Sequence, residues 1–343
     1  MRRYLPILLM AVFLLVIVLV GTTYLEGFAG HTKKENGNSL TVYTSLPMEQ
    51  AELLAQQFGK SSAIQVNLVP LSEQELIARL KNEANNPRAD VVVTAKPILQ
   101  QAGKLNLLEP YASEQTDIVS SRFKDKQDAW TGLWFDPIIF AVNQDYLKKT
   151  DQIAENWTNL SGDSKVRLAM TDFLAADAAA NLLYTFINTY GEEQTLKFFK
   201  KLHTQIIQYA KFLATPVRMA GMGECDIAIA VQSEALRYMQ EGFPLQIIYP
   251  DEGTAYVLTG TALVKNATHQ VESKQFIDWL LQAEAYQTLE KNRFYFVPTN
   301  PELKKFKDYK QKPVKLFDKE FEFTSEQQLK FLDNWVQTVR LGK

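Results

Sequence analysis

Short apolar runs alternate with amphipathic stretches between residues 39 and 143, and this alternation restricts the fold more than any other feature of the sequence. Three runs predict buried strands, because each is short, rich in β-branched residues and bounded by turn-forming residues: LTVYT (40–44), IQVNLV (64–69) and ADVVVTA (89–95). Apolar residues at helical spacing separate these runs, and Ser72 with Glu75 forms a capping box that begins one helix. Alternating strands and helices predict a parallel sheet with helices on its faces.

The pattern repeats after a further apolar run at residues 137–143, which predicts a crossover from a first lobe into a second. An Ala-rich helix is expected to end at Gly191. Three later runs predict two strands of the second lobe and a return to the first: KVRLAM (165–170), DIAIAV (226–231) and TALVKN (261–266). We therefore predict an α/β protein of two lobes, each a mostly parallel sheet flanked by helices, joined by crossover strands.

The predicted chain has four parts: an export leader, a polar tether and two lobes. The crossovers separate the two lobes. The predicted bounds are 1–29 for the leader, 30–38 for the tether, 39–138 with 258–343 for lobe 1, and 139–257 for lobe 2. About 310 residues remain after the leader, which is enough for two hydrophobic cores. Apolar residues at helical spacing near the C-terminus predict further core-facing helices.

The first residues have the pattern of an export signal, with two arginines before the apolar run 5–20. Small residues at 27 and 29 predict cleavage before Gly30. An apolar run of about 16 residues is also close to the lower limit for a membrane-spanning helix, so an uncleaved anchor is the alternative. Either way, the folded part is expected in the periplasm or another extracytoplasmic space.

Composition excludes several classes of protein. The 37 basic and 39 acidic residues give a net charge of −2, which argues against a nucleic-acid partner. The single cysteine, Cys225, allows no internal disulfide. The sequence contains no P-loop, no His-Glu-x-x-His motif and no metal-ligand spacing among its three histidines. We therefore expect no enzymatic activity and no cofactor. We also expect the protein to be a monomer.

Polar residues that directly follow predicted strands are the first binding candidates, because open α/β sheets bind ligands beyond the carboxyl ends of their strands. They are Thr44, Ser45, Thr94, Thr171, Asp172 and Ser233. Hydroxyl groups and the free N–H groups of helix N-termini form anion sites. The alternative for each is that its side chain caps its own helix.

A Gly- and Thr-rich turn between residues 249 and 267 adds Glu252, Thr254 and Tyr256, since it delivers polar groups just before an apolar strand. Trp134 is either an aromatic wall for a cation or part of the core at the hinge. Thr215, with Arg218 three residues later, is either an anion clamp or an ordinary surface pair.

Five collinear segments resemble the extracellular solute-binding proteins of ABC importers: VYTSLPMEQAELLAQQF, ELIARLKNEANNPRADVVV, TGLWFDPIIFAVN, GECDIAIAV and YPDEGTAYVLTGTALVKNA. The resemblance implies the type 2 periplasmic binding protein fold, in which two lobes close over one solute before delivery to a membrane permease. It also implies that the turn carrying Glu252 and Thr254 lies near the solute. The solutes of such relatives include ferric iron, phosphonates, sugar phosphates and polyamines.

Departures from the family pattern narrow the solute. Ferric-binding members carry paired tyrosines where this chain has Gln232 and Ser233, so a ferric site is kept only as an alternative. Asp172 and Asp177 stand where relatives often have serines, and a carboxylate repels a phosphate. A solute with a cationic amine, such as an aminophosphonate or a polyamine, fits Asp172, Asp177 and Glu252 better than a phosphate does. The expected solute classes are an aminophosphonate, a phosphate ester or a polyamine. A membrane-anchored ligand sensor is the remaining alternative.

Overall fold

The computed structural model describes residues 38–150, 153–162, 165–312, 314–317 and 323–342. The predicted leader and nearly all of the tether lie outside the described residues. Every element below lies within the unit Leu40–Lys343, apart from Ser39, the first residue of the first strand. Within the described ranges, no helix is both long enough and apolar enough to cross a bilayer.

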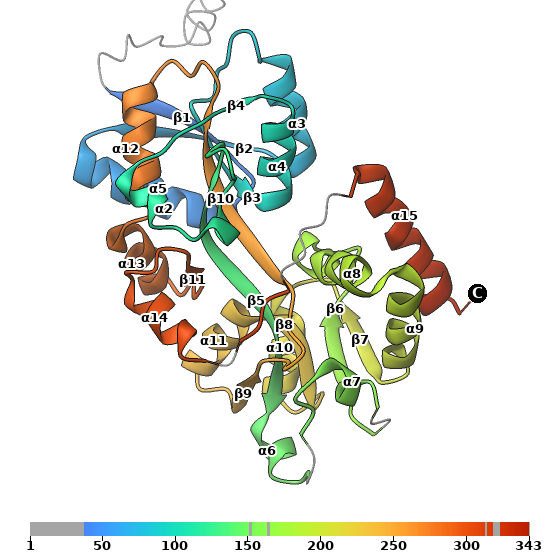
Figure 1. Cartoon of the computed structure of the whole chain (residues 1–343). Helices are drawn as coiled ribbons and strands as arrows, with labels where there is room; N and C mark the ends of the chain where they lie inside the picture. The colour runs from blue at the N-terminus through green and yellow to red at the C-terminus, as the bar shows by residue number, and fades with distance from the viewer. Residues whose placement is uncertain (1–37, 151–152, 163–164, 313, 318–322, 343) are drawn as a thin grey trace, which may run out of the picture. The chain divides into compact units, whose positions relative to one another are not determined.

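The first lobe is built on parallel strands joined by helices (Figure 1). Its strands lie in the order β2-β1-β3-β10, in which β1 and β3 are parallel and β10 is antiparallel to β3. The elements are β1 (Ser39–Thr44), α2 (Met48–Ser62), β2 (Gln65–Pro70), α3 (Glu73–Asn82), β3 (Val91–Ala95), α4 (Lys96–Lys104), β4 (Leu108–Glu109), α5 (Glu114–Asp117), β10 (Tyr256–Val264), α12 (Gln270–Leu280), α13 (Ala283–Lys291), β11 (Val297–Pro298) and α14 (Lys304–Lys310). The predicted capping box is present: the Ser72 backbone N–H donates to Glu75 Oε2 over 2.9 Å, and the Glu75 N–H donates to Ser72 Oγ over 3.4 Å.

The second lobe repeats this arrangement with β6 between β7 and β8, all three parallel. Its elements are α6 (Gln144–Leu147), α7 (Trp157–Leu160), β6 (Leu168–Thr171), α8 (Asp177–Tyr190), α9 (Glu192–His203), β7 (Ile206–Ala210), α10 (Ala214–Gly221), β8 (Ile227–Val231), α11 (Gln232–Gln240) and β9 (Leu245–Ile248). As predicted, α8 ends at Gly191, whose φ of +86° lies in the region that favours glycine.

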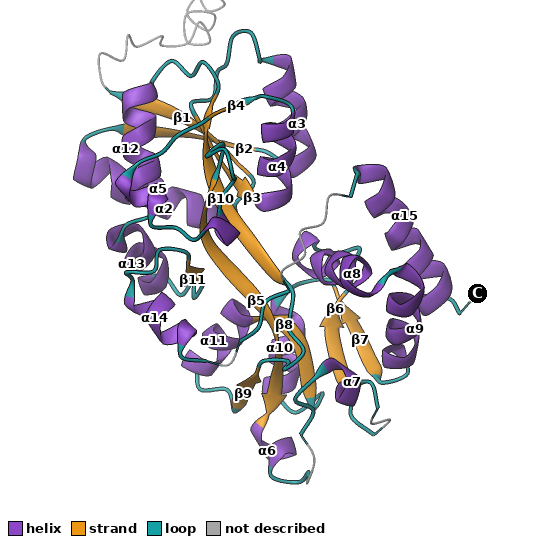
Figure 2. Cartoon of the chain, in the orientation of Figure 1, coloured by secondary structure: helices purple, strands orange, loops and turns teal. Residues whose placement is uncertain are grey.

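One long strand, β5 (Thr131–Asn143), belongs to both sheets (Figure 2). Its first half pairs with β10 and β11, and its second half pairs with β8 and β9. The prediction gave a strand only from residue 137, because Gly132 and Asp136 interrupt the apolar run before it. Gly132 is required there, since a Cβ would lie 2.6 Å from the Phe123 carbonyl oxygen. The predicted α/β architecture with crossover strands is confirmed.

The last helix and the turn that follows it pack on the second lobe, although the predicted bounds assigned them, within residues 258–343, to the first. Trp335, the last residue of α15 (Ser325–Trp335), and Val339, in the π-helical turn Val336–Arg340, belong to the hydrophobic core of the second lobe. Trp335 is fully buried against Phe173 and Tyr209. In Figure 1, α15 lies beside α8 and α9. Helical spacing showed that these residues face a core but not which one.

Residues 314–317 also connect the two lobes. The Thr254 N–H donates to the Lys315 carbonyl, and the Phe317 N–H donates to the Thr254 carbonyl, both over 2.9 Å. The Phe317 ring contacts Phe186 of the second lobe, while an Arg122 Nη donates to the Leu316 carbonyl over 2.8 Å from the first lobe. The chain therefore passes between the lobes through β5, β10 and this third segment.

Candidate functional site

The carboxyl ends of β1 and β3 bring three predicted residues together in the first lobe. Thr44 Oγ1 donates to the Val93 carbonyl over 2.8 Å and accepts from the Leu46 N–H over 3.0 Å, so Thr44 shapes the loop. The hydroxyls of Ser45 and Thr94 lie 2.6 Å apart. Thr94 is fully buried and Ser45 is half-buried, so this side of the site is lined by hydroxyl groups whose positions are fixed by the parallel register of the two strands.

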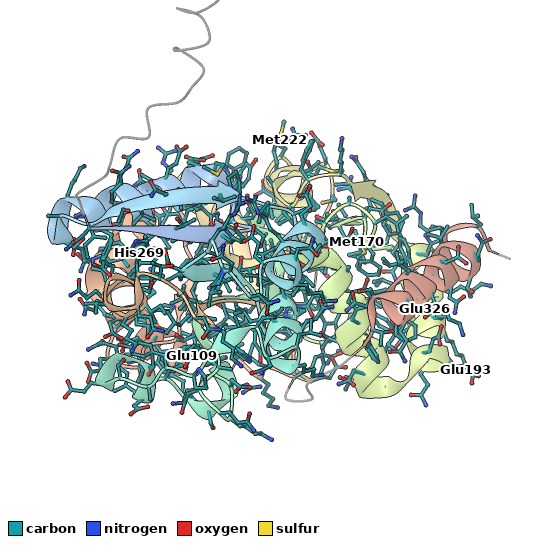
Figure 3. All side chains as sticks on the ribbon, turned by 90° about the horizontal axis from the view of Figure 1, so that it is seen from above. Glu109, Met170, Glu193, Met222, His269 and Glu326 are labelled. Atoms are coloured by element: carbon teal, nitrogen blue, oxygen red, sulfur yellow. The ribbon has the colours of Figure 1, made fainter. Side chains whose placement is uncertain are left out.

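A pocket lies at the corresponding edge of the second lobe, at the carboxyl ends of β6 and β8. It is lined by Ile138, Met170, Thr171, Phe173, Ala178, Ala179, Leu182, Leu213, Ile229, Ala230 and Val231. Figure 3 shows Met170 further inside the lobe than Glu193 and Glu326, which lie toward its outer edge. Thr171 has the one polar side chain of this lining, and its Oγ1 donates to the Phe212 carbonyl over 3.4 Å. This side of the site is therefore apolar.

Asp177, which adjoins this pocket in the sequence, repels a carboxylate of the first lobe, Glu73. Asp177 is the first residue of α8, directly before the lining residues Ala178 and Ala179. Glu73 is the first residue of α3; burial raises the pKa of Glu73 to about 7, and repulsion from Asp177 adds to the rise. Neither side chain forms a hydrogen bond or ion pair with another described residue. Glu73 is not among the predicted site residues, although it follows β2, as the predicted residues follow their strands.

Asp172, at the end of β6, is held by the C-terminal segment. Its carboxylate pairs with Arg340 and also accepts from the Leu174 N–H over 2.9 Å. The Arg340 guanidinium lies 4.2 Å from the centre of the Tyr209 ring and 5.5 Å from that of Trp335. The charge of Asp172 is thus already compensated within the second lobe.

The predicted turn residues hold the crossovers together. Glu252 accepts from the backbone N–H groups of Trp157 and Thr158, over 2.6 and 3.2 Å, and so caps α7. Thr254 is fully buried and its Oγ1 donates to the Ile138 carbonyl over 2.6 Å. The Tyr256 carbonyl accepts from Asn181 Nδ2 over 2.7 Å, while its ring packs among aromatic residues of the first lobe.

Ser233 is hydrogen-bonded to Asp136, a buried acid that is not among the predicted site residues. Its N–H and Oγ donate to the two carboxylate oxygens of Asp136, over 2.9 and 2.5 Å. Burial raises the pKa of Asp136 to about 7, although these hydrogen bonds oppose the rise. Asp136 lies on β5 at the point where its pairing changes from β10 to β8.

Trp134 and Thr215 lie apart from one another. Trp134 is buried in the core of the first lobe and stacks on Phe296, with ring centres 5.6 Å apart. Thr215 lies in the first turn of α10, two residues after the lining residue Leu213. Arg218 is exposed on the same helix. In the described part of the chain, no group of three or more His, Cys, Asp or Glu residues could hold a metal ion.

Comparison with known proteins assigns the class. Residues 54–316 match the model of the family described as bacterial extracellular solute-binding protein. The chain is 26% identical to a probable ABC transporter periplasmic-binding protein of Sinorhizobium fredii, over 77% of this chain and 75% of that protein. It is 27% identical to a putative 2-aminoethylphosphonate-binding periplasmic protein of Salmonella typhi, over 66% and 68%.

A solved structure agrees with this assignment. The periplasmic binding protein AfuA of Actinobacillus pleuropneumoniae, bound to fructose-6-phosphate, superimposes with a TM-score of 0.71 and 28% identity over 89% of this chain and 99% of that one. The chain belongs to the bacterial extracellular solute-binding proteins. The predicted two-lobed type 2 periplasmic binding protein fold is thereby confirmed. Members of the family are non-enzymatic components that bind small solutes and work with ABC permeases outside the cytoplasm.

Proposed function

We propose that this protein captures an aminophosphonate, a phosphate ester or a polyamine between its lobes and delivers it to the permease of an ABC importer. One observation carries the proposal. The polar groups of the first lobe and the pocket of the second lobe both lie at the carboxyl ends of parallel strands, where open α/β sheets bind ligands. The strand β5 belongs to both sheets and so joins the two lobes. The names of the Salmonella and Actinobacillus relatives support a phosphorus-containing or amine-containing solute.

Capture follows from hinge bending about the segments that join the lobes. The proposed lobes keep the predicted bounds, 39–138 with 258–343 and 139–257, except that α15 moves with the second lobe. Closure would remove the solute from water and complete its contacts. The closed form then docks to the permease as a monomer, without a nucleic-acid partner.

The candidate residues divide into two roles in this proposal. Ser45, Thr94, Thr171 and Thr215 contact the solute, because they lie at the strand ends or beside the pocket. The remaining candidates hold the loops and crossovers in place through the hydrogen bonds and ring contacts described above: Thr44, Trp134, Asp172, Ser233, Glu252, Thr254 and Tyr256.

Export uses the N-terminal leader, with cleavage before Gly30 releasing the protein into the periplasm. The alternative is retention by residues 5–20 as an anchored ligand sensor. N-terminal sequencing of the protein recovered from its own cells separates the two: a terminus at Gly30 supports release, and an intact leader supports the sensor.

Thermal unfolding of the exported protein tests the proposed function. A panel of 2-aminoethylphosphonate, fructose 6-phosphate, inorganic phosphate, diamines and ferric citrate would be screened. A solute present at about 100 times its Kd stabilises the folded state by about 2.7 kcal/mol, which gives a clear rise in Tm. A rise with ferric citrate alone would favour the ferric alternative, and no rise with any compound would contradict the proposal.

A further inference from the structure

The loop between β6 and α8 forms part of the pocket wall. Residues 172–176 make up this loop, and its Phe173 lines the pocket, as do Ala178 and Ala179 in the first turn of α8. The N-cap residue of α8 is Ala176, whose side chain forms no capping hydrogen bond. The start of α8 is therefore not fixed by a cap of its own, and the pocket wall depends on other groups that hold the loop.

Asp172 is the residue at which the β6–α8 loop is held. Its N–H donates to the Ala210 carbonyl over 2.9 Å, and its carbonyl accepts from the Ala175 N–H over 2.9 Å. One oxygen of its carboxylate accepts from the Leu174 N–H over 2.9 Å, and the other pairs with Arg340. The Asp172 side chain is 19% exposed, so loss of its cationic partner would leave a largely buried charge without compensation. Movement of the loop toward water would relieve that cost.

Arg340 is held in place by the rings around it. Its guanidinium carbon lies 4.2 Å from the centre of the Tyr209 ring and 5.5 Å from that of the Trp335 ring. Stacking of this kind orients a guanidinium group. Trp335 is fully buried and also packs against Phe173, with ring centres 4.8 Å apart. Residues 335–340 thus contact the β6–α8 loop twice, through the charge of Asp172 and through the ring of Phe173.

We propose that Arg340 is a positioning residue of the solute site, which acts through Asp172 to hold the β6–α8 loop in the conformation that binds solute. This inference rests on the proposed function, since it treats the pocket of the second lobe as the solute site. Arg340 does not line the pocket, so its effect on affinity is indirect. A loop that is ordered beforehand loses less conformational entropy when solute binds, and its affinity is therefore higher than that of a mobile loop.

Hydrogen–deuterium exchange of the exported protein without any solute tests whether Arg340 orders the loop. In Arg340→Gln, amide exchange over residues 171–178 should accelerate about tenfold or more, because opening of the loop breaks the hydrogen bonds that Leu174 and Ala175 donate. Arg340→Lys keeps the positive charge and should restore part of the protection. Mass spectrometry measures the exchange, and unchanged protection in Arg340→Gln would overturn the inference.

The matched control is Arg167→Gln, because it breaks the same kind of ion pair at the other end of β6. Arg167 directly precedes β6 and pairs with Asp226 over 2.7 Å, whereas Asp172 directly follows the strand. The Asp226 side chain is 13% exposed, so this variant also strands a largely buried carboxylate and should lower the Tm. Exchange over residues 171–178 should nevertheless stay as in wild type. Equal acceleration in both variants would mean that any loss of stability opens the loop, and would overturn the specific role of Arg340.

Solute affinity is the second measurement. Calorimetric titration uses 2-aminoethylphosphonate, fructose 6-phosphate and 1,4-diaminobutane, and Arg340→Gln should weaken binding of the compound that wild type binds about three- to tenfold. Asp172→Asn keeps an oxygen for the Leu174 N–H but loses the charge, so it should give a similar loss. The double variant should lose no more than either single variant, because Arg340 acts through Asp172. A double variant whose loss equals the product of the two single losses would overturn the inference.

The two measurements separate this inference from the proposed function. Equal affinity of wild type and Arg340→Gln for a bound compound would overturn the inference and leave the proposed function intact. Failure of wild type to bind any of the three compounds would contradict the proposed function, while the exchange experiment would still decide whether Arg340 orders the loop.

Discussion

The two strand-end regions have the same architecture but opposite side-chain chemistry. In the first lobe, Ser45 and Thr94 present hydroxyl groups that hydrogen-bond to one another. In the second lobe, the equivalent edge is a pocket of aliphatic and aromatic side chains, with Phe173 and Ile138 among them. The parallel βαβ arrangement thus fixes where a ligand binds, whereas a few residues after each strand decide what it can be.

The apolar pocket of the second lobe shares residues with the hydrophobic core of that lobe. A substitution there should therefore lower the free energy of unfolding more than any other substitution considered below. Phe173 is 1% exposed, lines the pocket and packs against Phe199 and Trp335. Phe173→Ala should lower the free energy of unfolding by about 3–5 kcal/mol, because it leaves a cavity that the fold fills incompletely. Denaturant unfolding measures this loss.

The matched control for that variant is Phe212→Ala, since Phe212 is 64% exposed and belongs to the same lobe. We expect a change within about 0.5 kcal/mol. Equal losses in the two variants would mean that the pocket wall is not part of the core.

Asp136, the buried acid on the strand β5 that both lobes share, should make the free energy of unfolding depend on pH. The pKa of Asp136 is about 7 in the folded protein, raised by burial from 3.8, so folding favours the protonated carboxyl. Its stabilisation is fully present below pH 3.8 and is lost as the pH rises through about 7. Around it lie Ser233, which donates two hydrogen bonds, Glu234, whose charge raises the pKa further, and Tyr249.

Asp136→Asn tests this dependence. The wild-type free energy of unfolding should fall with a slope of up to about 1.4 kcal/mol per pH unit from this group between pH 4 and 7. The variant should lose that part of the slope, while the part from Glu73, whose pKa is also about 7, should remain. Unfolding measured across this pH range gives the answer, and identical slopes in the two proteins would contradict the assignment.

Loss of the hydrogen bond between Ser45 and Thr94 should have the smallest effect on the free energy of unfolding. Ser45→Ala removes the partner of the buried Thr94 hydroxyl and should cost about 1 kcal/mol. Ser61→Ala is the control, because Ser61 is an exposed hydroxyl residue on α2. The free energies of unfolding of both variants would be compared with wild type, and a loss at residue 61 as large as that at residue 45 would show that the pair has no special role.

Local patterns predicted most of the elements, because strand and helix periodicity and the capping box at Ser72 depend on neighbouring residues. The first half of β5 was missed, since Gly132 and Asp136 interrupt its apolar run and its pairing with β10 involves residues far along the chain. Long strands that pass through two sheets are buried on both faces, and their periodicity is therefore weak.

The candidate site was harder to predict for the same reason. The strand-end rule selected Ser45, Thr94 and Thr171, and the structure places them at the expected edges. It also selected Asp172, whose partner Arg340 lies 168 residues away. No local signal reports such a pairing, because it depends on which lobe the C-terminal helix covers. Glu73 also follows a strand, but locally it stands inside the capping box of Ser72 and Glu75, so the sequence pattern there indicates only the start of a helix.

The location of Trp335 has a consequence for how the protein is made. A core that includes this side chain cannot be completed before residue 335 has left the ribosome. The second lobe therefore lacks part of its core until residue 335 has been added, even though its strands β6 and β8 are finished more than 100 residues earlier. If the proposed leader exports the chain N-terminus first, the strands of the second lobe enter the translocation channel before that core can be completed.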